Sequence, residues 1–171
     1  LDSGRVLHKF PAVGLGGASP VFTKKGDVFL TVTPDSVTLW DIESGSARVR
    51  IDQTGAFLSF NEAIFTADNH YALLRDSGRD HVLLLDLQLG IVARHFPAEN
   101  SGFSSSSNSY WLLRDKSGEV SLLNASYDGS YRLFDPVSGE EKLRFSTGTG
   151  YITAAQLSAD GRHLATAGED R

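Results

Sequence analysis

The sequence contains no cysteine and no methionine among its 171 residues. Without thiols, disulfide frameworks, thiolate zinc sites and cysteine nucleophiles are excluded. Because no methionine is present, Leu1 is not a translation start, and we expect the chain to be a piece of a longer protein.

Long runs of positive charge and long apolar runs are also missing. The formal net charge is −5, and the lysines and arginines form no stripe that a polyanion could follow, so nucleic acid is not expected as the main partner. Apolar residues come in short runs split by polar turns, far below the roughly 20 residues needed to cross a bilayer, so we expect no membrane span. Cytoplasm is only the default compartment, because a signal for export could precede Leu1.

The sequence does have a repeat, marked by an aspartate that follows a short apolar strand-like run. Asp41, Asp86 and Asp135 end three such runs, 45 and 49 residues apart. A glycine follows each aspartate by four positions and a large apolar residue follows it by ten: Gly45 and Ile51, Gly90 and Phe96, Gly139 and Phe145. Gly4 and Phe10 have the same mutual spacing, which predicts that residues 5–10 form the outermost strand of a preceding unit.

A second column of turn residues supports the first. Each member closes a short polar turn, where a residue that tolerates positive φ is needed: Gly26, Asn69, Gly118 and Gly161. From each of the first three turns to the next repeat aspartate there is room for a strand, a turn and another strand. One unit therefore reads as four short antiparallel strands, predicted in the third unit at 110–114, 120–125, 131–134 and 140–145.

A lone four-stranded sheet with two apolar faces cannot bury both, so the units must stack face to face. Radial stacking predicts an all-β fold, a β-propeller of about four four-stranded antiparallel blades. A β-sandwich or barrel with similar hairpins is the alternative. The predicted units are the end of a blade at 1–10, then 11–51, 52–96, 97–145 and an incomplete unit at 146–171.

The segments Leu39-Trp40-Asp41, Leu85-Asp86 and Phe134-Asp135, with Leu157-Ser158-Ala159-Asp160-Gly161 near the end, resemble the WD-repeat (β-transducin repeat) family. The resemblance covers essentially the whole chain. It implies about half of a seven- or eight-bladed ring, completed by further blades of the same chain or by a second copy.

No unit has the Gly-His pair of the family pattern, so the repeats are divergent. In the family, this histidine joins a serine or threonine, a turn aspartate and the tryptophan in a buried hydrogen-bond network. Here Asp128 with Phe134, or Thr166 with Asp170, supply only part of it. The resemblance and the repeat together assign a structural role to Trp40, Asp41, Asp86, Asp128, Phe134, Asp135, Thr166 and Asp170.

No constellation for chemistry stands out. The histidines (His8, His70, His81, His95 and His163) lie in different units or turns and lack metal-ligand spacing. Because the repeat aspartates recur with the units, turn stabilisation explains them better than acid–base catalysis. We therefore expect no catalytic residue, metal or cofactor.

The long connections between units are the predicted binding segments, because loops on a rigid scaffold commonly carry binding. In WD-repeat proteins such loops line one face of the disc and bind partner peptides. Candidate partner-binding residues, in or beside these loops and turns, are Phe57, Arg79, Phe103, Tyr110, Trp111 and Tyr127. That the aromatic residues only pack beneath their own loops is an equal alternative. The function predicted is a non-catalytic scaffold that binds a protein or peptide; the alternative is a propeller enzyme or small-molecule sensor with a central-channel site.

Overall fold

The computed structural model describes residues 4, 6–10, 20–33, 36–52, 60–76, 81–97, 110–125, 130–146 and 152–168. All the regular elements in these ranges are β-strands, paired antiparallel into three four-stranded sheets and one two-stranded sheet. This confirms the predicted all-β class and its four-stranded antiparallel units.

Each sheet is one blade, and its strands follow in chain order. Blade 1 consists of β1 (Val21–Phe22), β2 (Val28–Val32), β3 (Ser36–Asp41) and β4 (Ala47–Asp52). Blade 2 consists of β5 (Phe60–Phe65), β6 (Tyr71–Asp76), β7 (His81–Asp86) and β8 (Ile91–Phe96). Blade 3 consists of β9 (Tyr110–Arg114), β10 (Val120–Ala125), β11 (Tyr131–Phe134) and β12 (Glu141–Phe145). In blade 4, β13 (Ile152–Leu157) pairs with β14 (Leu164–Gly168).

The third and fourth strands of each complete blade share an irregularity at one place. The register shifts between Leu39 and Trp40, between Leu84 and Leu85, and between Leu133 and Phe134. Each shift lies immediately before a repeat aspartate. A bulge increases local twist, so the same deformation is copied with the same turn in all three blades.

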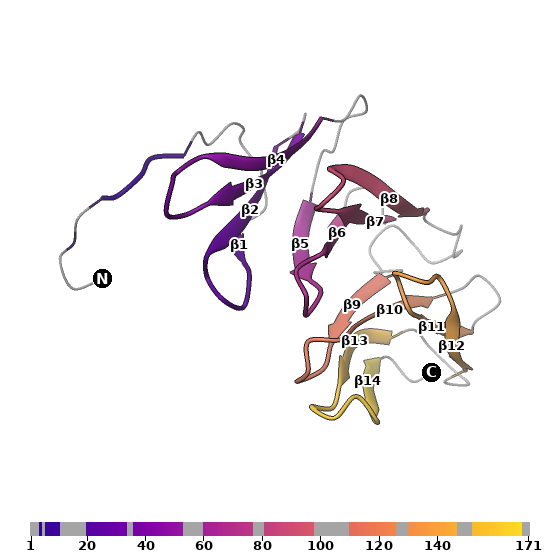
Figure 1. Cartoon of the computed structure of the whole chain (residues 1–171). Coiled ribbons are helices and arrows are strands. Elements are labelled where there is room, and N and C mark those ends of the chain that lie inside the picture. Colours follow the sequence, from indigo (N-terminus) through magenta and orange to yellow (C-terminus); the bar gives the residue numbers. More distant parts are fainter. Residues whose placement is uncertain are drawn as a thin grey trace.

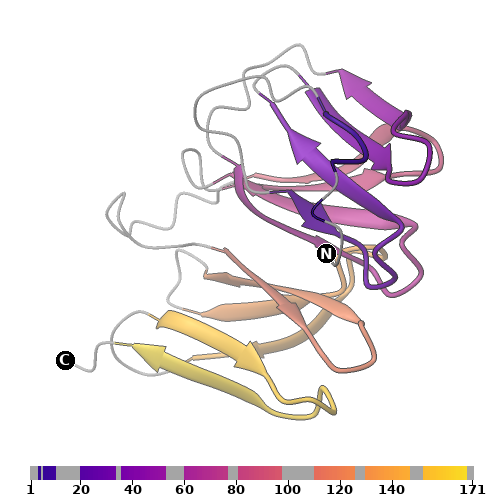
Figure 2. The same cartoon turned by 90° about the vertical axis from the view of Figure 1, so that its left-hand side faces the viewer.

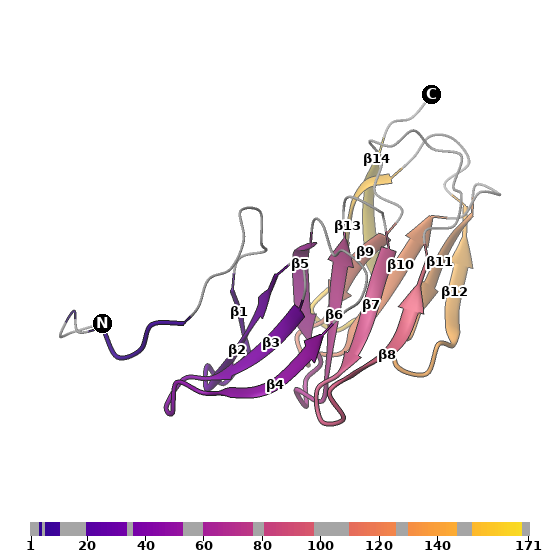
Figure 3. The same cartoon turned by 90° about the horizontal axis from the view of Figure 1, so that it is seen from above.

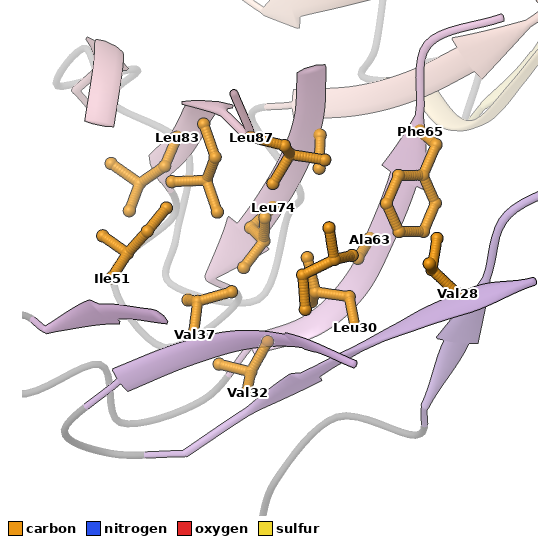
Figure 4. Packing of buried hydrophobic residues seen from close by; sticks show 13 residues of the cluster. Val28, Leu30, Val32, Val37, Ile51, Ala63, Phe65, Leu74, Leu83 and Leu87 are labelled. Atoms are coloured by element: carbon orange, nitrogen blue, oxygen red, sulfur yellow. The ribbon is translucent and has the colours of Figure 1, made fainter. Parts of the chain in front are cut away.

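Side chains alternate between the two faces of each sheet, and both faces are apolar. In blade 1, Leu30 and Val37 face blade 2, where they meet Leu74 and Leu83 (Figure 4). These four residues belong to a buried cluster that fills the space between the two sheets. An apolar layer between two sheets is what face-to-face stacking of blades requires.

The next two interfaces repeat this arrangement. The alternate residues of blade 2, Leu73 and Leu84, face away from blade 1 and pack with Leu122 of blade 3. Between blades 3 and 4, Leu123 packs in a cluster with Ile152. The Tyr131 hydroxyl accepts a hydrogen bond from the Ile152 backbone N–H at 2.8 Å, which adds a polar tie to this interface.

The blades fan around a common concave side (Figure 1). The first strands, β1, β5, β9 and β13, lie along that side, and β4, β8 and β12 lie along the outer side. Seen from above, the three four-stranded sheets follow one another in chain order, and β13 and β14 lie beside β9 (Figure 3). The hairpins that join the first and second strands turn toward the same side of the molecule (Figure 2). Equivalent turns of successive blades are therefore neighbours.

The prediction of a strand at residues 5–10 is wrong for the described residues, since 6–10 form no strand. The segment nevertheless packs on the outer face of blade 1, where the Phe10 ring lies edge-on to Phe29 and Trp40. A strand requires a hydrogen-bonded partner strand, and the sheets of the described chain offer none at this place.

Candidate functional site

Three outer turns, which we define as the turns between the third and fourth strands, are built on the repeat aspartates. In blade 3, Asp135 Oδ1 accepts backbone hydrogen bonds from Val137 at 2.8 Å and Ser138 at 2.9 Å. Asp86 makes the equivalent pair in blade 2, and Asp41 accepts from the Ser44 N–H at 2.8 Å in blade 1. The glycine four positions later has positive φ in all three turns. The repeat aspartates therefore stabilise these turns through hydrogen bonds to the backbone.

The second partner of the repeat aspartate differs between blades. Arg48 donates to Asp41, His70 Nε2 lies 3.3 Å from Asp86 Oδ1, and Lys142 Nζ lies 3.4 Å from Asp135 Oδ2. The Ser44 backbone N–H, together with Arg48, lowers the pKa of Asp41 to about 2. A carboxylate stabilised in its charged form at neutral pH is a poor general acid or base.

Four inner turns, defined as the turns between the first and second strands, pair a hydroxyl with a carboxylate. Thr66 Oγ1 donates to Asp68 Oδ1 at 2.5 Å and Ser158 Oγ to Asp160 Oδ1 at 2.6 Å. These two bonds lower the pKa of Asp68 and Asp160. In blade 1 Thr23 Oγ1 donates to Asp27 Oδ1, one residue beyond the turn, and in blade 3 the order is reversed, with Ser117 Oγ donating to Asp115 Oδ1. The fourth turn position has positive φ in every blade: Gly26, Asn69, Gly118 and Gly161.

Neighbouring inner turns touch one another. The Lys116 backbone N–H donates to the Ala159 carbonyl at 2.9 Å, which joins blades 3 and 4. A Cβ atom at Gly118 would stand only 3.0 Å from the Ala67 Cβ, so blades 2 and 3 also meet there. The inner turns of blades 2, 3 and 4 therefore form one continuous surface.

A cavity of about 250 Å³ opens in this surface between blades 1, 2 and 3. Its charged lining residues are Lys24, Arg114, Asp115 and Lys116. The sequence reasoning missed this cluster. One signal could have found it, because Arg114 occupies the position that Phe65 and Leu157 hold in the neighbouring blades, directly before the inner turn.

A wider cavity of about 690 Å³ lies beside residues 6–10. Four of its charged lining residues are paired, Arg48 with Asp41 and Lys25 with Asp27 at 3.7 Å, and Glu43 also lines the cavity. The His8 side chain, also in the lining, is hydrogen-bonded to the Glu43 carbonyl at 3.0 Å. This cavity therefore offers few unpaired charges to a ligand.

Two of the predicted partner-binding residues are buried in β9. Tyr110 is 4% exposed and Trp111 is 8% exposed. The Tyr110 hydroxyl donates to the Pro97 carbonyl at 2.6 Å, and Trp111 packs in the cluster between blades 3 and 4. In this arrangement both side chains contribute to packing, and their role in binding a partner stays a prediction.

The other predicted residues are not gathered in one place. Trp40 Nε1 donates to Thr31 Oγ1 at 2.8 Å, Phe134 packs between blades 2 and 3, and Thr166 is exposed on β14. Six predicted residues lie outside the described part of the chain: Phe57, Arg79, Phe103, Tyr127, Asp128 and Asp170.

The histidines do not form a metal centre in the described structure. His70 stacks on Tyr71, His81 meets His95 edge-on at a ring distance of 4.9 Å, and His163 is highly exposed. Within the described ranges no group of three or more potential ligands could hold a metal ion. In the same ranges no helix is long and apolar enough to cross a membrane.

Comparison with known proteins supports the fold alone. No protein-family model matches the chain, and no curated protein matches it in sequence. Among solved structures, the chain is similar to the WD40 repeats of RRP9, with a TM-score of 0.63 and 17% sequence identity over 92% of this chain. The match covers 46% of the RRP9 chain, so this chain spans about half of that protein's length. The likeness shows β-propeller blades of the WD40 type.

Proposed function

We propose that the chain is a non-catalytic scaffold that binds a protein or peptide partner through the connections between its blades. One observation carries this proposal. The repeat aspartates, which are the carboxylates that recur at one place in every complete blade, all accept turn hydrogen bonds. The residues best placed for catalysis therefore stabilise turns instead. A rigid scaffold with variable connections is suited to binding a partner.

The fold supports the same conclusion, because propellers of the WD40 type typically serve as platforms for other proteins. Fold alone does not fix function, so the assignment depends on how the polar residues are used. Ring size, the division into units and the completion of the ring by further blades or by a second copy stay predictions.

The experiment compares the chain with the variant Phe57→Ala/Phe103→Ala, which removes two predicted anchors, and with Lys25→Ala as a control on the turn side. Proteins enriched by each bait from cell extract are quantified, and the best candidate is purified for titration calorimetry. Matching circular dichroism spectra establish that all three chains fold alike. We expect the purified partner to bind the wild-type chain and Lys25→Ala equally, and the double variant at least about tenfold more weakly, since interface anchors are often worth over 1.4 kcal/mol.

Equal affinity of the purified partner for the double variant would overturn binding through these connections. Turnover of a substrate by the chain alone would overturn its non-catalytic character. The alternative function, a propeller enzyme or small-molecule sensor with a central-channel site, is favoured by one observation: three cationic side chains line the inner-turn cavity.

A further inference from the structure

One charged residue breaks the apolar row that precedes the inner turns. The row consists of Phe22, Phe65, Arg114 and Leu157, the last residues of the first strands or their equivalents. Phe65 is 3% exposed and packs between blades 1 and 2, as expected for an apolar residue here. At the same position Arg114 of blade 3 is exposed, as is Phe22 of blade 1, so burial does not account for an arginine there.

Arg114 lies where two other cations converge. It lines the 250 Å³ cavity together with Lys24 from the inner turn of blade 1 and Lys116 from that of blade 3. Lys116 stands at a turn position that blades 2 and 4 fill with Ala67 and Ala159. Lys24 holds the same turn position in blade 1, so all three cations stand where another blade has an uncharged residue.

The acid that shares the cavity is already engaged. Asp115 Oδ1 accepts hydrogen bonds from the Ser117 hydroxyl at 2.6 Å and from the backbone N–H groups of Gly118 at 3.0 Å and Glu119 at 2.9 Å. These bonds hold the carboxylate within its own turn. With three cations and one acid, the charged lining of the cavity has a net charge of +2, in a chain whose formal net charge is −5.

Within the part of the chain that the structure describes, the three cations have no carboxylate partner. Among the described residues, none of the ion pairs or side-chain hydrogen bonds includes Lys24, Arg114 or Lys116. Neighbouring atoms also partly desolvate the guanidinium, which lowers the pKa of Arg114. Because desolvation disfavours the charged form of a side chain, a bound anion at this place would stabilise the charged guanidinium.

We propose that the inner-turn cavity is a binding site for a phosphate group, held by Arg114, Lys116 and Lys24. The guanidinium fork matches two phosphate oxygens at once, and the two ammonium groups add point charges. A dianionic phosphate balances the +2 charge of the lining. Phe65 and Asn69 also line the cavity, beside the place where the group that carries the phosphate would lie.

The site goes beyond the proposed function, because it lies on the turn side and needs no binding through the blade connections. The phosphate could come from a free phosphate ester or from a phosphorylated side chain of a partner. Both sources present the same oxyanion to the same three cations, and the experiment distinguishes them.

The test is titration calorimetry of the whole chain at constant ionic strength with inorganic phosphate, ribose 5-phosphate and a phosphoserine hexapeptide with its unphosphorylated form. We expect phosphate to bind and the unphosphorylated peptide not to bind. Arg114→Leu and Lys116→Ala should each weaken binding by about tenfold or more, as expected for loss of a charge-assisted contact. Both variants should fold, because each introduces a residue that another blade has at that position.

Lys25→Ala is the matched control, since it removes the same charge from the same turn as Lys24 but lies outside this cavity. Its phosphate affinity should equal that of the wild type. Tighter binding of ribose 5-phosphate than of the phosphopeptide would indicate a free ester, and the reverse order a phosphorylated partner. The proposal is overturned if none of the phosphate compounds binds, or if Lys25→Ala weakens binding as much as Arg114→Leu does.

Discussion

Blade 2 and blade 4 have similar strands but different surroundings. Blade 2 is covered on both faces, and its residues Leu73, Leu74 and Val82 are fully buried. Blade 4 packs on blade 3 through Ile152, while Ala165 and Ala167 on its other face are exposed. We therefore expect a blade to be more stable when both neighbours cover it, because hydrophobic stabilisation scales with the apolar area removed from water.

Replacing a leucine by alanine should show the largest difference in stability between these blades. Leu84→Ala, between blades 2 and 3, should lower the free energy of unfolding by about 2–5 kcal/mol, the range for a buried leucine in a packed core. Leu157→Ala removes the same atoms from a partly buried place between blades 3 and 4 and should cost about 1 kcal/mol. Urea unfolding followed by tryptophan fluorescence measures both values. Equal losses would contradict the link between burial and stability that separates the two blades.

Replacing the turn glycines by alanine should give stability losses of intermediate size that differ between blades. Gly26 and Gly118 occupy the same inner-turn position, with φ of 73° and 96°. Alanine at Gly26 would meet nothing within 4 Å, so its cost is the left-handed backbone alone, about 1 kcal/mol. Alanine at Gly118 would also press on Ala67 of blade 2, and overpacking adds about 1–3 kcal/mol. Thermal unfolding of the two variants tests this order, and a Gly26→Ala loss as large as that of Gly118→Ala would refute the blade contact.

The smallest expected effect concerns the exposed outer turn of blade 1. Because the folded-state pKa of Asp41 is lowered to about 2, its charged form stabilises the fold above the ordinary pKa near 3.8. This contribution disappears as pH falls from about 4 to about 2. Asp41→Asn should therefore be less stable than wild type at pH 7 and equal to it near pH 2. Urea titrations across this range check the prediction, which fails if the difference between the two chains does not change with pH.

The repeat was predictable because it is specified by local chemistry. Strands with apolar residues on both faces and turns that need positive φ recur at fixed spacing, and the structure has strands at the expected places of the third unit. A strand was wrongly predicted at 5–10 because Gly4 and Phe10 have the spacing that is typical of a fourth strand. Spacing predicts where a strand would pair, but a strand forms only where a partner strand is present.

The contacts of this segment nevertheless match those of a true fourth strand. His8 and Arg94 each stand four positions after the unit's glycine. His8 Nε2 is hydrogen-bonded to the Glu43 carbonyl, and Arg94 donates to the Ser138 carbonyl at 3.1 Å, in both cases in the outer turn of the next blade. The outer face of blade 1 is thus built like an interface between blades, which favours the predicted preceding unit.

The inner-turn cavity could not be predicted in the same way, because its residues come from three separate turns. Lys24 and Arg114 are far apart in sequence, and only the stacking of blades brings them to one cavity. In the sequence, only Arg114 indicated the cavity, because it is a charged residue at a position where the other blades have an apolar residue. Departures from the repeat pattern were more informative about binding than the pattern itself.

Amide hydrogen exchange of the whole chain, read out by mass spectrometry, tests most directly whether neighbours stabilise each blade. Amides of β6, β7 and β10, which lie in blades covered on both faces, should exchange most slowly, and those of β13 and β14 should exchange markedly faster. Equally slow exchange in β13, β14 and β6 would contradict the account, because blade 4 would then be stable without a second neighbour.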